Sequence, residues 1–535
     1  MEREVAIDPE MLGKVFEKLI EENRRRGLGA FYTPREIVHY MCQESLITHL
    51  YRAVNSTKVQ GVLGLPAVHE GISREDLSEW IRKSDQFAHY AAAIAAGTKG
   101  DHYPKPPRSI IEHARVLDEE LRDIKVCDPA IGSGAFPVGM MIEIVRARLA
   151  LTPYFTDTEE RTAYHFKRRA IQYCIYGVDI DRGAVEIARL RLWLSLVVDE
   201  EDVKQIKPLP NLDFKIVPGN SLLGFPFQTH GLAAIERMKI QYFDEPDHGR
   251  KAQLRNKIDE RIQHHLSQSQ RSLGYQVDFD FRLFFSEVFN EQGGFDVVIA
   301  NPPYVDSERM ATEQPELRAT YSEHFSTAKG NWDLFIIFIE QGIRQLNSGG
   351  VISYIVPNKL LGAPYAEALR KLLQQRAVLE IRDYSSVKVF KEAAVYPVVF
   401  RAAMDAAARP EPTMTVMSDL EQPMQSRTVP VDVFYADTSW DRYFGTEVVF
   451  AVVMKIAGHA ALVDQCKEVG AAATVSEAYE LKKVVLESGA ASGKRFKKFV
   501  NTGTIDRYAF LWGEQRTRYI KGSDETPVVL GTTLN

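Results

Sequence analysis

The sequence predicts an α/β protein with a doubly wound, mostly parallel sheet, and two observations carry this prediction. First, short apolar segments recur along the chain, at 124–126, 175–178, 214–217, 295–300 and 351–356. Second, helical stretches such as 135–149, 183–198 and 333–346 separate these segments, and Gly349-Gly350 is expected to close the last one. Short strands that alternate with helices are typical of parallel sheets covered on both faces. Ligands bind in such folds beyond the carboxyl ends of the strands, so the residues that follow each strand are the candidate site.

The composition is that of a soluble globular protein. The 535 residues are 45% hydrophobic and 26% charged, enough for roughly two to four domains with cores of their own. Because 66 Lys and Arg stand against 72 Asp and Glu, a uniformly basic nucleic-acid coat is excluded and any nucleic-acid surface must be local. The four cysteines are scattered, which argues against a disulfide framework and a structural zinc site. The charged start and the lack of a long apolar run predict a cytoplasmic protein.

Two helical regions are expected before the sheet, at 1–57 and 58–120. Apolar residues at helical spacing predict a first helix between Met11 and Ile20. A second helix is expected after Thr33, with Thr33 as its N-cap, Pro34 as its first residue and Glu36 completing a capping box. Residues 58–120 are interpreted as a helical insertion, interrupted by a Gly/Pro-rich stretch and without a catalytic cluster.

A catalytic domain is expected at 121–405 and a C-terminal region at 406–535. The polar segment 228–275 is predicted to be helical, and its adjacent His264 and His265 point to different sides of a helix, so they are interpreted as solvated. After about residue 405 the alternation of strands and helices is lost, and a proline-rich stretch at 409–412 marks the expected boundary. Ten Lys and Arg stand against three acids between 481 and 521, so this window carries +7 and the rest of the chain -13.

A glycine-rich turn follows the first expected strand, from Asp128 to Phe136. Glycines permit a tight turn and let a ligand approach the backbone at the helix N-terminus. No Gly-Lys-Ser/Thr follows, which argues against a P-loop. Asp179 ends the next strand, where a carboxylate can accept both hydroxyls of a ribose; a helix-capping aspartate is the alternative.

The sequence Asn301-Pro302-Pro303-Tyr304 follows the fourth apolar segment. Prolines cannot donate backbone hydrogen bonds and hold the chain extended, so their carbonyls and the Asn301 side-chain oxygen are presented as acceptors. Two acceptors that converge on one exocyclic amino group would direct its nitrogen lone pair at an electrophile, and Tyr304 could stack on the ring. The alternative is a structural Asn-Pro-Pro turn at the end of a strand.

In motif order these residues resemble the gamma-class N6-adenine DNA methyltransferases, in particular the Eco57I-like methylases of type IIG restriction-modification and phage-exclusion systems. The resemblance covers about residues 10–405 and, more loosely, 490–535. It implies the class I fold of methyltransferases that depend on S-adenosylmethionine (SAM), and methyl transfer from SAM to N6 of an adenine flipped out of duplex DNA. The catalytic residues that it implies are Asn301, Pro302, Pro303, Tyr304 and Phe390. Phe390 aligns with an aromatic that packs against the flipped base, and a core position is its alternative.

The resemblance also implies the cofactor contacts. The motif Phe31-Tyr32-Thr33-Pro34 matches one that touches the methionine part of SAM, and Asp179 with Ile180 matches the ribose and adenine contacts. Asn220 falls where the family often has an aspartate that binds the adenine amino group, and its side-chain carbonyl can accept instead. The expected cofactor-binding residues are Tyr32, Thr33, Pro34, Asp128, Ala130, Gly132, Gly134, Asp179, Ile180, Asn220 and Ser221. No metal is expected.

Residues 406–535 are expected to form a partial target-recognition domain that binds DNA, because aromatic residues interleave its basic window. The expected phosphate contacts are Lys494, Arg495, Lys497, Lys498 and Arg507, and a solvated basic face is the alternative. The region is shorter than recognition domains of this family usually are. We therefore expect a truncated chain, or a separate recognition or nuclease subunit as a partner beside double-stranded DNA.

Other functions stay open at this point. Asn-Pro-Pro-Tyr recognises a planar amino group, so RNA or a glutamine side-chain amide are alternative substrates. A DNA-binding component with a silent methylase fold is a further alternative. Cleavage by the chain itself is not expected, because no Pro-Asp…Glu-x-Lys cluster is found.

Overall fold

A computed structural model describes two compact units, Met1–Met454 and Lys455–Asn535. The described residues are 32–55, 71–97, 103–197, 212–225, 232–245, 247–390, 395–405, 409–457 and 459, with five short strands beyond them. The helix predicted between Met11 and Ile20 lies outside this part of the chain. In the second unit, β10 (Leu486–Glu487), β14 (Pro527–Leu530) and β11 (Phe496–Lys498) form one small sheet, and β12 (Ile505–Asp506) pairs with β13 (Ala509–Phe510).

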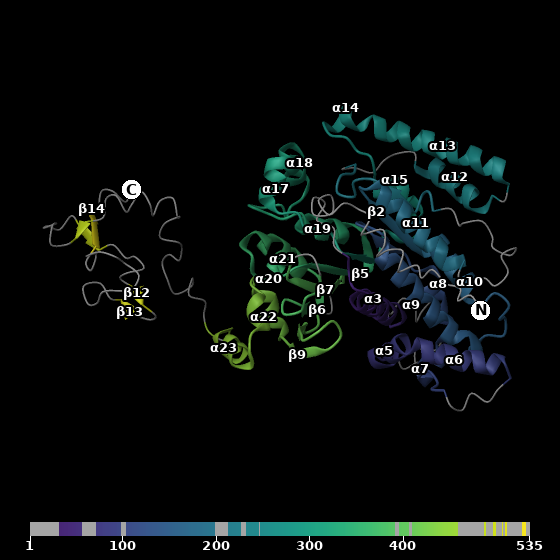
Figure 1. Ribbon diagram of the computed structural model, residues 1–535, viewed down its shortest axis with the longest axis horizontal. Coiled ribbons are helices and arrows are strands. Elements are labelled where there is room, and N and C mark those ends of the chain that lie inside the picture. The colour runs from purple at the N-terminus through teal and green to yellow at the C-terminus, as the bar shows by residue number, and fades with distance from the viewer. Residues whose placement is uncertain are drawn as a thin grey trace, which may run out of the picture. The chain divides into compact units, whose positions relative to one another are not determined.

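A nine-stranded sheet organises the first unit (Figure 1). Its order is β3-β2-β1-β4-β5-β7-β6-β8-β9. Five of the neighbouring pairs are parallel, and the three pairs β5–β7, β6–β7 and β8–β9 are antiparallel. The strands are β1 (Val126–Asp128), β2 (Ile175–Asp179), β3 (Ile216–Pro218), β4 (Phe295–Ala300), β5 (Leu346–Pro357), β6 (Ala377–Asp383), β7 (Pro397–Ala403), β8 (Thr413–Met417) and β9 (Pro423–Thr428). The predicted α/β fold with a mostly parallel sheet is therefore confirmed.

The central strands are apolar along their whole length because both faces of the sheet are covered. In β4, Val297 and Ile299 pack into one hydrophobic cluster, and Val298 and Ala300 pack into a second one. All four side chains are fully buried. Successive side chains of a strand point to opposite faces, so each cluster is the core on one side of the sheet.

Helices from distant parts of the chain build the two covering layers. One layer contains α3 (Arg35–Val54) and α9 (Ala135–Leu151), and the other contains α19 (Phe335–Gln345). The remaining helices are α5 (Arg74–Arg82), α6 (Ser84–Ala95), α7 (Arg108–Glu112), α8 (Ala114–Asp123), α10 (Ala163–Arg169), α11 (Arg182–Val197), α12 (Leu232–Asp244), α13 (His248–Ser267), α14 (Ser269–Leu273), α15 (Phe281–Phe284), α16 (Ser286–Gln292), α17 (Ser307–Glu313), α18 (Pro315–His324), α20 (Lys359–Gly362), α21 (Glu367–Gln374), α22 (Val431–Ala436) and α23 (Glu447–Ala457). Single turns lie at Thr152–Tyr154, Ala170–Cys174, Pro364–Ala366 and Asp441–Phe444. Figure 1 shows α12 to α14 at one end of this unit and the insertion helices α5 to α7 at the other.

Two local predictions are wrong. Helix α3 begins at Arg35, with Pro34 rather than Thr33 at its N-cap position and without a side-chain cap. The Thr33 hydroxyl oxygen instead accepts a hydrogen bond from Asn301, the residue directly after β4. Gly349 and Gly350 do not close a helix. They lie inside β5, which begins directly after α19 ends at Gln345.

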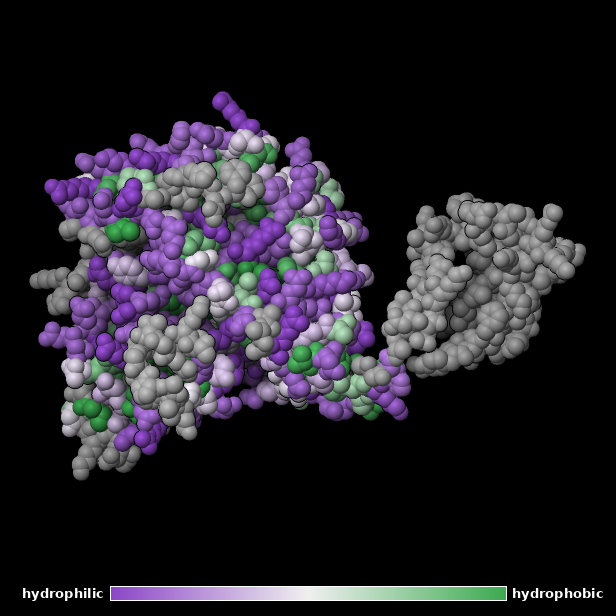
Figure 2. Space-filling view, turned by 180° about the vertical axis from the view of Figure 1, so that it is seen from behind, coloured by the Kyte–Doolittle hydropathy of each residue, from purple (hydrophilic) through white to green (hydrophobic). Residues whose placement is uncertain are grey.

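The sheet continues beyond residue 405, since β8 pairs with β6 and β9 pairs with β8. Four exposed apolar side chains lie together on α23, namely Val448, Val449, Val452 and Ile456, and Val448 is 73% exposed. Figure 2 shows this apolar patch against a mostly hydrophilic surface. Within the described ranges, no helix combines the length and the apolar character needed to cross a membrane.

Candidate active site

The parallel strands bring four sequence motifs to one edge of the sheet. Strands β3, β2, β1 and β4 are neighbours and run in the same direction. Asp128, Asp179, Gly219 and Asn301 lie at or directly after their carboxyl ends. Motifs separated by more than a hundred residues thus meet where ligands bind in doubly wound folds.

The glycine loop crosses from β1 to the start of α9 in a conformation that requires glycine. Gly132 has φ +52° and Gly134 has φ +83°. A Cβ on Gly134 would lie 3.0 Å from the Cβ of Ala188 in α11. The amide of Ile131 donates to the Val178 carbonyl of β2 at 2.9 Å, which ties the loop to the neighbouring strand. A Cβ on Gly132 would instead meet only the Ala130 carbonyl, at 4.0 Å, so this side of the loop is open to a ligand.

The two predicted aspartates have different positions. Asp128 is 1% exposed and accepts from the Ala130 amide at 3.0 Å, and burial raises the pKa of its carboxyl well above the usual range. Asp128 therefore shapes the loop from within. Asp179 accepts from the Gly132 amide at 2.8 Å and from the Asp181 amide at 2.9 Å, and burial raises its pKa as well. A carboxylate offers about four acceptor positions, so Asp179 has capacity left for ribose hydroxyls.

Asn220 and Ser221 turn inward. The Asn220 Oδ1 accepts from the Leu222 amide and its Nδ2 donates to the Tyr321 hydroxyl, both at 3.0 Å. The Ser221 hydroxyl is buried and donates to the Pro129 carbonyl at 2.7 Å. Ser221 thus fastens the turn after β3 to the turn after β1.

The structure joins the first and the last motif directly. The Asn301 side-chain Nδ2 donates to the Thr33 Oγ1 at 3.1 Å, across 268 residues of sequence. Thr33 is 3% exposed. The nitrogen and the oxygen of a side-chain amide point in different directions, so a hydrogen bond to Nδ2 also sets where Oδ1 points. Thr33 therefore fixes the orientation in which the Asn301 Oδ1 can accept a hydrogen bond from a substrate. Sequence reasoning missed this contact, because neither motif contains a local signal for the other.

Tyr304 and Phe390 form an aromatic pair beside Asn301. Their ring centroids are 6.1 Å apart at 76°, an edge-to-face arrangement. The Tyr304 hydroxyl donates to the Ile355 carbonyl at 3.1 Å, and burial raises its pKa well above the usual range, which keeps the ring neutral. Phe390 is 4% exposed and belongs to a core cluster. Phe390 therefore packs against the Tyr304 ring as part of the hydrophobic core.

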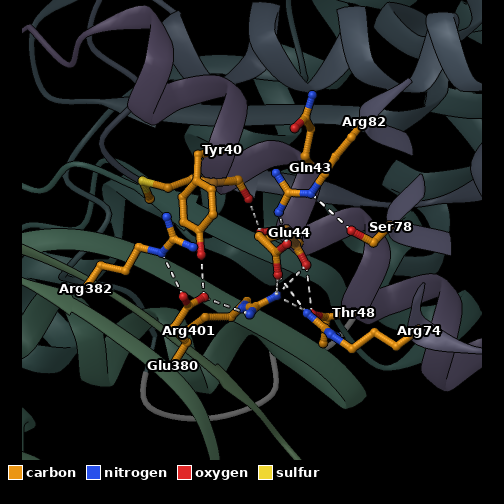
Figure 3. Close-up of polar contacts among 12 residues, drawn as sticks. Tyr40, Gln43, Glu44, Thr48, Arg74, Ser78, Arg82, Glu380, Arg382 and Arg401 are labelled. Carbon is orange, nitrogen blue, oxygen red and sulfur yellow. Dashed lines mark hydrogen bonds and ion pairs between the residues drawn. The ribbon is translucent and has the colours of Figure 1, made fainter. Parts of the chain in front are cut away.

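A buried ionic network holds α3, and with it the Thr33 segment, against the sheet (Figure 3). Glu44 of α3 pairs with Arg74 of α5 at 2.7 Å, with Arg82 and with Arg401 of β7. Arg401 also pairs with Glu380 of β6 at 3.0 Å. Burial alone would raise the pKa of Glu44, but the three arginines outweigh it and lower the pKa to about 2. The network connects the N-terminal helix, the insertion and the far strands of the sheet.

A pocket and a buried cysteine lie near this edge of the sheet. Among the residues that the structure describes, no group of three His, Cys, Asp or Glu side chains could hold a metal. A pocket of about 630 Å³ opens beside the ends of β2 and β3, and Ile180, 63% exposed, lines it. Cys127 is fully buried in β1 and burial raises its thiol pKa well above the usual range. A nucleophilic role for Cys127 is thereby disfavoured.

The predicted DNA contacts belong to the second unit or lie outside the described residues. Lys497 and Lys498 lie in β11 of the second unit. Lys494, Arg495 and Arg507 lie outside the described residues.

Comparison with known proteins finds a family match in the middle of the chain. Residues 173–390 match the family described as Eco57I restriction-modification methylase. The putative type II restriction enzyme and methyltransferase RM.MjaORFECS2P of Methanocaldococcus jannaschii is 26% identical over 481 residues, which cover 73% of this chain and 37% of the relative. The type II restriction enzyme and methyltransferase RM.Eco57I of Escherichia coli is 26% identical over 304 residues, covering 54% of this chain and 25% of the relative.

Among solved structures, the type IIL restriction-modification enzyme MmeI in complex with DNA is similar with a TM-score of 0.44 and 14% identity. That similarity covers 81% of this chain and 45% of MmeI. The chain spans well under half the length of the two curated relatives.

Proposed function

Because residues 173–390 match the Eco57I restriction-modification methylase family, we propose that this chain is an adenine-specific DNA methyltransferase of a restriction-modification or related phage-defence system. It transfers a methyl group from SAM to N6 of an adenine that has been flipped out of duplex DNA. The observation that carries the proposal is the Asn301 amide, held by Thr33 at 3.1 Å at the sheet edge that also carries the glycine loop.

The residues at this edge fit SAM. Asp179, which already accepts from the Gly132 amide, would accept hydroxyls of the ribose; the open side of Gly132 would let the ligand approach the loop, and the exposed Ile180 side chain would pack on the adenine. When bound, SAM supplies an electrophilic methyl group. Tyr32, Thr33 and Pro34 directly precede α3, Thr33 contacts Asn301, and these three residues would border the methionine part of SAM.

The substrate adenine is recognised through its amino group. The Asn301 Oδ1 and the Pro302 carbonyl accept its two hydrogens, which orients the nitrogen lone pair toward the methyl group. Tyr304 stacks on the flipped base, and its hydroxyl bond to Ile355 fixes the ring plane. Unstacking the base costs a few kcal/mol, which these contacts offset. No covalent enzyme intermediate is required.

Target selection is assigned to the remaining chain and to partners. Lys494, Arg495, Lys497, Lys498 and Arg507 would track DNA phosphates, and a separate recognition or nuclease subunit would complete the system. Methylation by the full chain should therefore fall steeply as salt rises.

The proposal is tested with Asn301→Ala. We expect single-turnover methylation of duplex DNA to fall at least 100-fold, because one of the two acceptors for the amino group is lost. Binding of S-adenosylhomocysteine, measured by calorimetry, should change less than about threefold. Tritium transfer into duplex DNA, RNA and cellular protein by the wild type is measured in parallel. A wild-type rate in the variant, or transfer only into RNA or protein, contradicts the proposal.

A further inference from the structure

The turn after β3 lacks the acid that the family resemblance leads one to expect there. Its place is taken by Asn220, whose Oδ1 accepts from the Leu222 amide and whose Nδ2 donates to the Tyr321 hydroxyl. Both polar ends of the side chain are thus turned back onto the protein. These two contacts fix the Asn220 side chain, and Asn220 is not among the residues that line the pocket beside Gly219.

A carboxylate reaches the same turn from a different segment. The Asp278 Oδ1 accepts from the Asn220 backbone amide at 2.9 Å, 58 residues away in sequence. Its other oxygen, Oδ2, accepts no hydrogen bond from any residue that the structure describes. The side chain is exposed. A carboxylate anchored through one oxygen and open at the other is an acceptor ready for a donor from solution.

The backbone around Asp278 is rigidly held. Val277 and Phe279, on either side, are fully buried. The Val277 amide donates to the Ser269 hydroxyl oxygen at 2.9 Å. A Cβ on Gly219 would lie 2.4 Å from the Cβ of Phe279, so only glycine lets the two segments approach this closely. The position of the Asp278 carboxylate is therefore set by core packing.

Asp278 shares a pocket with the residues expected to contact the base. The pocket of about 630 Å³ is lined by Ile180, Gly219 and Asp278, together with residues of α13. Asp179, the ribose acceptor, ends β2, and β3 is the next strand outward. A nucleoside whose ribose lies at Asp179 and whose methyl-bearing end faces Asn301 has its base on the side of β3, over Ile180 and beside Asp278.

We propose that Asp278 is a specificity-determining residue of the cofactor site, whose carboxylate accepts the exocyclic amino group of the SAM adenine. This inference rests on the proposed function. Asp278, which lies before α15, would thus bind the adenine amino group that Asn220, in the turn after β3, does not contact.

The test compares two ligands that differ in the group that Asp278 is proposed to bind, the exocyclic amino group of the purine. S-adenosylhomocysteine carries the amino group, and S-inosylhomocysteine carries a carbonyl oxygen in its place. Both are titrated calorimetrically into the full-length wild type, Asp278→Ala and, as a matched control from the same pocket, Asp259→Ala. We expect the wild type to prefer S-adenosylhomocysteine, and Asp278→Ala to bind it about 10- to 100-fold more weakly, the loss expected for one charge-assisted hydrogen bond.

The preference between the two ligands is the decisive readout. Asp278→Ala should bind both ligands with similar affinity, and Asp259→Ala should keep the wild-type preference. If Asp278→Ala weakens both ligands by the same factor, Asp278 only supports the loop and the inference is wrong. It is also wrong if the variant keeps the wild-type affinities, even when the wild type methylates DNA. A wild type that discriminates as expected but methylates no DNA would overturn the proposed function alone.

Discussion

The contact between Thr33 and Asn301 gives the most specific prediction, because it separates catalysis from cofactor binding. Thr33→Val keeps the shape of the side chain and removes the oxygen that accepts from Asn301 at 3.1 Å. The half-buried Asn301 amide then loses this hydrogen bond, which costs about 1 to 3 kcal/mol. If this energy held the amide in its productive orientation, the methyl-transfer rate falls about 5- to 150-fold.

The assay is single-turnover methylation of a duplex oligonucleotide, combined with calorimetric binding of S-adenosylhomocysteine. Thr33→Ser retains the oxygen and serves as the matched control. We expect Thr33→Val to lower the rate constant with an affinity for S-adenosylhomocysteine within about threefold of the wild type, and Thr33→Ser to recover most of the rate. Thermal unfolding of both variants checks that the fold is intact.

Two results would refute this reasoning. Thr33→Val could lower the affinity for S-adenosylhomocysteine and leave the rate at saturation unchanged, which would make Thr33 a cofactor contact only. Alternatively, the serine variant could be as slow as the valine variant. The methyl group, rather than the hydroxyl, would then be the part of Thr33 that matters.

Two further predictions concern the scaffold. The pKa of Glu44 is lowered from 4.5 in the unfolded chain to about 2, so its pairing stabilises the fold above pH 4.5 and is lost as the pH falls toward 2; this amounts to about 3 kcal/mol. Urea unfolding between pH 7 and pH 3 measures the loss, and Glu44→Gln should be less stable at neutral pH with a flatter pH dependence. Gly134→Ala should destabilise the fold by at least about 1 to 2 kcal/mol, because the residue has a positive φ and a Cβ would press on Ala188. Gly349→Ala, where a Cβ meets only one atom at 3.7 Å, should change the melting temperature little, and equal shifts in both variants would contradict the account.

Local sequence signals predicted the central strands and the glycine loop well. The apolar run 295–300 coincides with β4, because a strand buried on both faces must be apolar throughout. The predictions failed where a distant partner competes with a local motif. Thr33 matches an N-cap, yet its hydroxyl is engaged by Asn301. The extension of the sheet by β8 and β9 was missed because β8 contains two threonines and β9 is largely polar and exposed, so neither has the continuous apolar pattern of the central strands.

By itself, the sequence determined the chemistry that is present: the glycine turn, the acid that ends β2 and the Asn-Pro-Pro-Tyr motif are each encoded within a few residues. Only the tertiary structure decided which of these groups face one another. Asn301 meets Thr33, and Asp278 meets the turn at Asn220, because parallel strand pairing and core packing bring distant segments to one edge. Hydrogen bonds between such segments depend on which strands become neighbours in the folded sheet, and no single segment encodes that order.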